Sequence, residues 1–175
     1  MNIFQKIIGH ARTIHKHRSM VRKLCFKCGL YWQGITHDLS KYSPIEFYNG
    51  VKYYTGTASP HIGERKDKGY SDAWIHHHNR NKHHAEYWQD IGPDGKSGAV
   101  MMPTKYFKEM ICDRVAASIV YLGDKYDDNA PLEYYLSHKD ENQFAPLTSS
   151  LLESCLRDIS KDNFEKALER IDKLL

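Results

Sequence analysis

Apolar residues recur at steps of three and four along most of the chain, and few stretches alternate with the two-residue period of β-strands. The N-terminal segment shows this clearly, with an apolar stripe of Ile3, Ile7, Ile14, Val21, Leu24 and Cys28. It predicts a helix over about residues 3–28 that ends at Gly29. Helical spacing puts His10 and His17 on the core-facing stripe and His15 on the polar side.

Further helices are predicted along the rest of the chain. Ser43-Pro44-Ile45-Glu46 is a capping box with proline at the first helical position, which predicts a helix to about residue 54. Other helices are predicted at about residues 71–89 and 104–126, followed by two or three amphipathic helices of which the last spans 160–175. A polar loop is predicted at 55–69 and a loop rich in glycine and proline at 92–103. The helix at 104–126 is apolar on most of its circumference and is expected to be central and buried. The last helix carries Phe164, Leu168, Ile171 and Leu175 on one face. The expected fold class is all-α.

Composition narrows the function classes. A length of 175 residues favours one domain, and 41% apolar residues suffice for a sizeable core. No apolar run approaches about 18 residues, so no membrane partner is expected. A net charge of +3 does not favour nucleic acid as a partner. The basic N-terminus does not resemble a signal peptide and the chain holds four cysteines, so a reducing cytoplasmic location is expected.

Histidine is the unusual residue of this composition, at 11 positions. His37 and Asp38 are adjacent, and both can reach one divalent cation if the backbone turns there, as at the start of a helix. Imidazole nitrogen with carboxylate oxygen suits Mn, Fe, Co, Ni or Zn. The alternative for the dipeptide alone is that Asp38 only caps a turn.

A second concentration of histidine lies in Tyr70–Trp88, where five of the 11 fall within nine residues. Read as a helix at 100° per residue, the segment has one face with four histidines, one arginine and two aromatic residues. These residues are His76, His77, Arg80, His83, His84, Tyr87 and Trp88. His78 is assigned to solvent on the opposite side. A tract that chelates metal loosely is the alternative.

Asp113 shares a helix face with apolar residues in the predicted 104–126 helix. An unpaired carboxylate there is costly, so it requires a cation or strong donors. A salt bridge to a basic side chain is the alternative to a metal. Glu109 lies one turn earlier on the same side and could orient a histidine that binds the metal.

In chain order these residues read His17, His37-Asp38, the histidines at 76–84 and Asp113, which resembles the H…HD…D pattern of the HD superfamily of metal-dependent phosphohydrolases. HDLSK is similar to the HDxGK of many members, with Ser40 in place of the usual glycine. HDLSKYSPIEF with HHxxRNKHHxEYW resembles, more closely, a small family of uncharacterised bacterial and phage proteins. The resemblance implies an HD-domain-like helical bundle over about residues 10–125, followed by a C-terminal helical extension at 127–175.

The resemblance implies that His17, His37, Asp38 and Asp113 hold a primary divalent transition metal. For a second ion, His77 and His84 are the best ligands and Asp38 the natural bridge. In a straight helix His77 and His84 are about 10 Å apart along the axis, so sharing one ion requires the NRN segment to bend. One metal, with the remaining histidines binding phosphate, is an equal alternative.

The expected reaction is hydrolysis of a small, nucleotide-like phosphorylated substrate by a metal-activated water. Lys41 and Arg80 would neutralise phosphate oxygens, and His83 or His76 would protonate the leaving group. One alternative is a di-iron oxygenase of the same fold, whose ligand types are identical. Another is a phage accessory protein that binds or cuts nucleic acid through the basic first helix.

Overall fold

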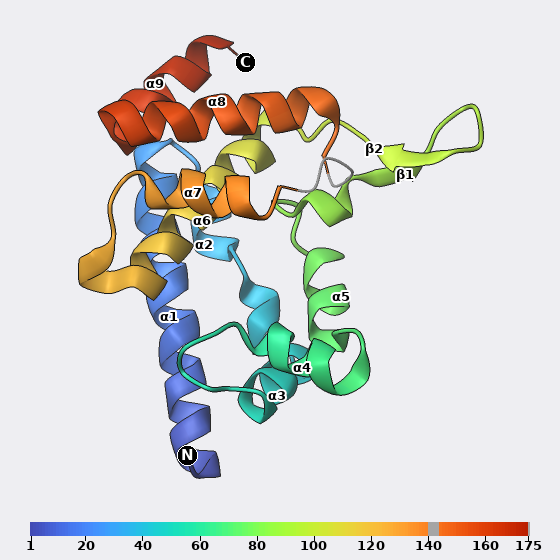
Figure 1. The fold of residues 1–175 in the computed structure, drawn as a ribbon, viewed down its shortest axis with the longest axis vertical. Helices are drawn as coiled ribbons and strands as arrows, with labels where there is room; N and C mark the ends of the chain where they lie inside the picture. The colour runs from blue at the N-terminus through green and yellow to red at the C-terminus, as the bar shows by residue number, and fades with distance from the viewer. Residues whose placement is uncertain (140–143, 175) are drawn as a thin grey trace.

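A computed structural model describes residues 1–139 and 144–174 of the chain (Figure 1). The α-helices of this part are α1 (Ile3–Lys27), α2 (Tyr31–Thr36), α3 (Pro44–Lys52), α4 (Pro60–Lys68), α5 (Asp72–His78), α6 (Thr104–Leu122), α7 (Ala130–Ser137), α8 (Pro146–Asp162) and α9 (Phe164–Leu174). The shorter elements are the 3-10 turns η1 (Leu39–Tyr42), η2 (Ala85–Tyr87) and η3 (Gly123–Lys125), and the strands β1 (Gln89–Ile91) and β2 (Ser97–Ala99). The predicted all-α class is confirmed, with one small hairpin as the β-structure of the described residues. None of their helices is long and apolar enough to cross a membrane.

The N-terminal helix α1 follows its predicted bounds. Asn2 and Gln5 form a reciprocal capping box at its start, and Gly29 has a φ of 71° just after its end. The stripe is buried from His10 to Leu24, which confirms the inward orientation of His10 and His17. Ile3 and Ile7 are exposed, because the first turns of α1 form a free end of the molecule (Figure 1).

Helix α6 lies at the centre of the core, as expected for a helix that is apolar on most sides. Its buried apolar side chains are Phe107, Met110, Ile111, Cys112, Val115 and Ala116. They belong to one hydrophobic cluster with Val21 and Leu24 of α1 and Leu152, Leu156 and Ile159 of α8. This packing fixes α1 against α6, and so sets the position of every polar side chain on their shared surface.

Two expectations for the middle of the chain were wrong. The predicted loop at 55–69 contains α4, which begins with Pro60 at its first turn and buries Glu64. The predicted helix at 71–89 ends at His78. Its end has a local cause: the side-chain amide of Asn81 donates to the carbonyl oxygen of His77 at 2.7 Å, and so occupies the acceptor that a continuing helix would use.

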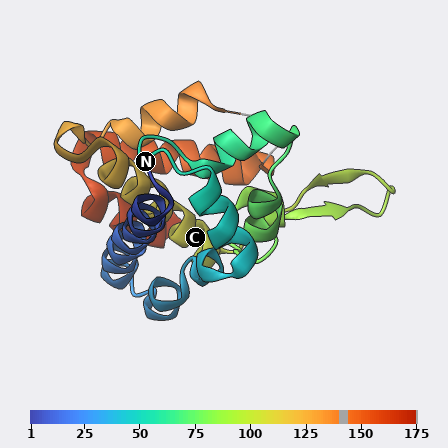
Figure 2. The same cartoon turned by 90° about the horizontal axis from the view of Figure 1, so that it is seen from below.

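Other differences lie at the hairpin and the C-terminus. The predicted loop at 92–103 contains β2, and the β1–β2 hairpin projects away from the helices (Figure 2). The predicted helix at 160–175 is the end of α8 followed by α9, since Asn163 adopts a φ of 98° and separates them. Phe164 and Leu168 are buried as expected. Leu175 and the side chain of Ile171 lie outside the described residues.

Candidate metal centre

Two sets of four side chains, joined by a shared aspartate, could each hold a metal ion. The first group consists of His17, His37, Asp38 and Asp113, and the second group of Asp38, His77, His83 and His84. In each group, one ligand atom from every residue lies within 4.8 Å of the others. The two groups meet at Asp38, which is 1% exposed.

The first group joins α1, the α2–η1 junction and α6. The Nε2 atom of His17 on α1 lies 2.8 Å from Oδ1 of Asp113 on α6 and 3.8 Å from Oδ2 of Asp38. The Nε2 atom of His37 is 3.4 Å from that same Asp113 oxygen and 3.5 Å from Oδ2 of Asp38. Two imidazoles and two carboxylates therefore each direct one possible ligand atom toward a common point.

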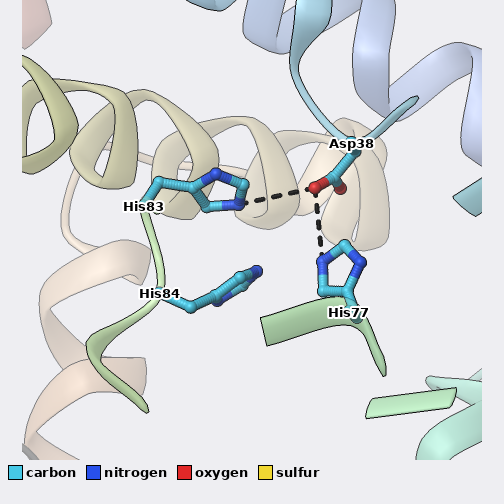
Figure 3. Close-up of side chains that lie close together, drawn as sticks. All are labelled: Asp38, His77, His83 and His84. Carbon is cyan, nitrogen blue, oxygen red and sulfur yellow. Dashed lines mark ion pairs between the residues drawn. The ribbon is translucent and has the colours of Figure 1, made fainter. Parts of the chain in front are cut away.

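The second group forms at the other oxygen of Asp38 (Figure 3). Oδ1 of Asp38 lies 3.2 Å from Nε2 of His77 and 3.4 Å from Nε2 of His83. The ring of His84 lies beside both, with centroids 4.8 Å from the ring of His77 and 4.2 Å from that of His83. Because Oδ2 faces the first group and Oδ1 the second, Asp38 has the arrangement of a bridging carboxylate.

Several of these atoms are buried without a hydrogen-bond partner among the described residues. They are Nε2 of His37, Oδ1 of Asp38, Nε2 of His83 and Nε2 of His84. An unsatisfied buried polar atom costs about 1–3 kcal/mol, so four in one place need an explanation. Their donor set of imidazole nitrogen and carboxylate oxygen fits divalent transition metals, and one cation in each group would satisfy them.

The backbone around His37 and Asp38 is shaped to present both side chains inward. Asp38 adopts the left-handed conformation, with φ 54° and ψ 27°, immediately before η1. Such a residue is strained by about 1–3 kcal/mol unless its surroundings hold it. Arg18 of α1 supplies part of that support, since its Nε donates to the carbonyl oxygen of His37 at 2.7 Å. The turn that the dipeptide required is therefore present.

Two buried glutamates orient the histidine rings. Oε1 of Glu109 accepts from Nδ1 of His37 at 2.9 Å and from Nδ1 of His83 at 3.1 Å. Oε2 of Glu46 accepts from Nδ1 of His77 at 2.8 Å. A carboxylate on Nδ1 fixes the tautomer, so that Nε2 carries the lone pair that a metal needs.

Burial and neighbouring charges shift pKa values in opposite directions within each group, since those of His17 and His84 are lowered and those of His37 and His77 are raised. Burial disfavours the ionised form of Asp38, yet His37 and Lys41 outweigh it and hold the aspartate's pKa well below its usual value. Burial likewise opposes the charged form of His37, but Asp38, Asp113 and Glu109 raise its pKa to about 10. For His84, burial and the neighbouring His83 together hold the pKa well below the usual value. In the absence of metal, His37 is therefore protonated near neutrality and His84 is not.

Comparison with known proteins supports the narrower of the two sequence resemblances. A model of a family of unknown function, DUF5662, matches residues 6–158. The chain belongs to the DUF5662 family. Neither the curated proteins nor the solved structures gave a match.

The structure brings most of the expected site residues of this DUF5662 chain together. All six expected metal ligands lie in the two groups: His17, His37, Asp38, His77, His84 and Asp113. The break after α5 removes the two-turn separation expected between His77 and His84. His83, expected to be a proton donor, points into the second group. Lys41 lies at the edge of the first group, with its Nζ 2.7 Å from Oδ2 of Asp38.

His76 and Arg80 lie outside both groups. His76 is half-buried, and its Nδ1 donates to Oε1 of Glu46 at 2.6 Å. Arg80 is exposed, and its guanidinium donates to the carbonyl oxygen of His76 at 3.3 Å. The helical face that was expected to carry both residues ends at His78.

Sequence reasoning missed two residues near the site. Glu46 appeared only as a capping residue of α3, whereas it is 4% exposed and holds His77. His61 of α4 lies with its ring centroid 6.4 Å from that of His77, and burial lowers its pKa to about 3. Glu46 was not detectable, because its burial between histidines follows from the packing of α3 beside α5. Nor was His61, because its segment was read as a loop.

Proposed function

We propose that the protein is a metal-dependent phosphohydrolase with an HD-like centre, in which each group holds one divalent transition metal (Mn, Fe, Co, Ni or Zn). The observation that carries the proposal is the position of Asp38, whose two oxygens each face a separate set of histidines. The order of these residues along the chain, H…HD…HH…D, is that of the two-metal HD proteins which the sequence resembles. A pair of ions bridged by a carboxylate suits the displacement of a leaving group from phosphorus.

Bound divalent ions supply two kinds of chemistry, a water of lowered pKa and neutralisation of charge on the phosphoryl group. The chain contributes Lys41, which is 27% exposed and close enough to the centre to contact a phosphate oxygen. Of the two expected proton donors for the leaving group, His83 points into the second group and His76 lies outside both groups, bound to Glu46. Arg80 has no part in this mechanism. The substrate class is a small phosphorylated molecule of nucleotide size.

Metal content and phosphate release test the proposal together. Tag-free protein purified without added metal should contain one to two transition-metal ions per chain by mass spectrometry. The same protein, loaded with Mn, Co or Zn, should release phosphate from some members of a panel of nucleotides and sugar phosphates. Asp38→Asn preserves the size of the side chain but removes the charge that both groups share, so both metal and activity should be lost.

Asp124→Asn is the matched control, because Asp124 is an exposed aspartate of η3 outside both groups. It should retain wild-type metal content and activity. Full activity in a folded Asp38→Asn variant would refute the proposal. Iron in the centre, with oxygen consumption in place of phosphate release, would replace hydrolysis by the oxygenase reaction.

A further inference from the structure

An open groove of about 590 Å³ lies at the α1–α6 surface, on the side toward the N-terminal end of α1. Helix α1, the segment after α3 and the end of α6 form its walls. The polar side chains that line it are Arg12, Thr13, Lys16, Tyr54, Thr57 and Tyr121. None of them takes part in the two groups of the candidate metal centre.

The floor of the groove is built by close packing. Oγ1 of Thr13 donates to the carbonyl oxygen of Gly9 at 3.0 Å and lies 3.2 Å from the hydroxyl of Tyr54. A Cβ at Gly9 would lie 2.6 Å from the ring of Tyr54, so this position requires glycine. The segment after α3 is thus held against α1, and the groove does not depend on a loosely attached loop.

The charge of the lining is one-sided. Arg12 and Lys16 are one turn apart on α1 and place two cations on the same wall. Among the described residues that line the groove, no carboxylate opposes them. The hydroxyls of Thr57 and Tyr121 can donate to an anion, whereas those of Thr13 and Tyr54 are hydrogen-bonded in the floor of the groove. A lining of guanidinium, ammonium and hydroxyl groups suits phosphate.

The groove lies on the same faces of α1 and α6 as the first group of the candidate metal centre. Thr13 precedes His17 by four residues on α1, which is about 6 Å along the helix. Val120 lines the groove and follows Asp113 by seven residues on α6, which is about 10 Å and two full turns, so both lie on the same face. One small molecule can therefore contact both places.

We infer that the groove binds a second phosphate group of the substrate, so that the substrate class is a small molecule with two separate phosphate groups. The phosphate that is hydrolysed lies at the metal centre, and the other contacts Arg12 and Lys16 in the groove. The choice of substrate rests on the proposed function, whereas binding of phosphate by the groove does not. The two claims are therefore tested separately.

Inorganic pyrophosphate is the probe, titrated calorimetrically into protein freed of metal by a chelator, at about 150 mM salt to screen weak surface charges. The wild-type protein should bind it at one site. The double variant Arg12→Ala/Lys16→Ala should bind at least about tenfold more weakly, the range expected for the loss of charge-assisted hydrogen bonds. The control is Arg22→Ala/Lys23→Ala, which removes the same charge from exposed positions of the same helix.

Weaker binding in the groove variant alone, with both variants folded by circular dichroism, supports the inference. No binding by the wild-type protein, or equal weakening in both double variants, overturns it. In metal-loaded protein, adenosine 3′,5′-bisphosphate should be preferred over adenosine 5′-monophosphate in kcat/KM, and this preference should fall in the groove variant. Intact pyrophosphate binding in a protein that hydrolyses no phosphate ester would refute the proposed function and leave the phosphate groove standing.

Discussion

The two groups at Asp38 use the same kinds of side chain but are built in different ways. The first group takes its ligands from α1, the α2–η1 junction and α6, segments up to 96 positions apart from His17 to Asp113. Apart from the shared aspartate, the second group takes its ligands from the eight positions between His77 and His84. Packing of long helices sets the geometry of the first group, whereas a local helix break sets that of the second.

Their charges differ as well. The first group has two carboxylates and two imidazoles, and the second has one carboxylate and three imidazoles. A dication is attracted more strongly by two carboxylates than by one. The second group would bind its ion mainly through neutral imidazole nitrogens, and the lowered pKa of His84 keeps that ring neutral. The first group should therefore bind its ion more tightly and the second should release its ion first.

Removal of one ligand from each group gives the largest expected effect. His17→Ala should abolish binding of the ion in the first group, and His84→Ala binding of the ion in the second group. Each loss of affinity should exceed the 10–100-fold that is typical when a residue that only orients a ligand is removed. The measurement is metal content after dialysis against a weak chelator. His15→Ala is the control, because His15 is exposed on the same helix as His17. Loss of both ions in either single variant would show that the two sites form only together.

The orienting glutamates offer a finer test of the same comparison. Glu109 holds one histidine of each group, whereas Glu46 holds His77 of the second group and His76 beside it. Glu109→Gln should lower the affinity of both ions by about 10–100-fold, and Glu46→Gln that of the second alone. Competitive titration with a metal-sensitive dye measures both affinities. An effect of Glu46→Gln on the first ion would contradict the independence of the two groups.

The difference between the groups also explains what could be predicted from the sequence. His17 and Asp113 could be placed because long apolar stripes on α1 and α6 determine which way they face. The arrangement of His83 and His84 could not, because it follows from a helix break at which the Asn81 side chain hydrogen-bonds the carbonyl oxygen of His77 and the hydroxyl of Ser40. The difference in free energy between this break and a continued helix is small, and the hydrophobic periodicity of the sequence does not reveal it.

Helix α4 was missed for a related reason. It buries little apolar surface, and its most buried side chain is Glu64, whose carboxylate accepts from the hydroxyl of Ser71 at 2.6 Å. A helix stabilised by polar contacts lacks the hydrophobic pattern from which helices are predicted. The orienting role of Glu46 was hidden in the same way, since it depends on α3 packing beside α5.

The stability of the metal-free protein depends on pH through histidines whose pKa values are shifted in opposite directions, upward for His37 and downward for His84. The pKa of His37 is raised to about 10, above its unfolded value of about 6.5, so protonated His37 stabilises the fold below pH 6.5. That contribution is lost as the pH rises through about 10. The pKa of His84 is lowered, so this residue makes the fold less stable as the pH falls below about 6.5.

The unfolding temperature, measured in chelator between pH 5 and pH 10, should therefore decline on both the acid and the alkaline side. His37→Gln, which keeps a donor for Glu109, should reduce the slope on the alkaline side, and His84→Gln the slope on the acid side. The remaining slopes come from His77 on the alkaline side and from His10, His17 and His61 on the acid side. Unchanged slopes in both variants would mean that other groups set the pH dependence of folding.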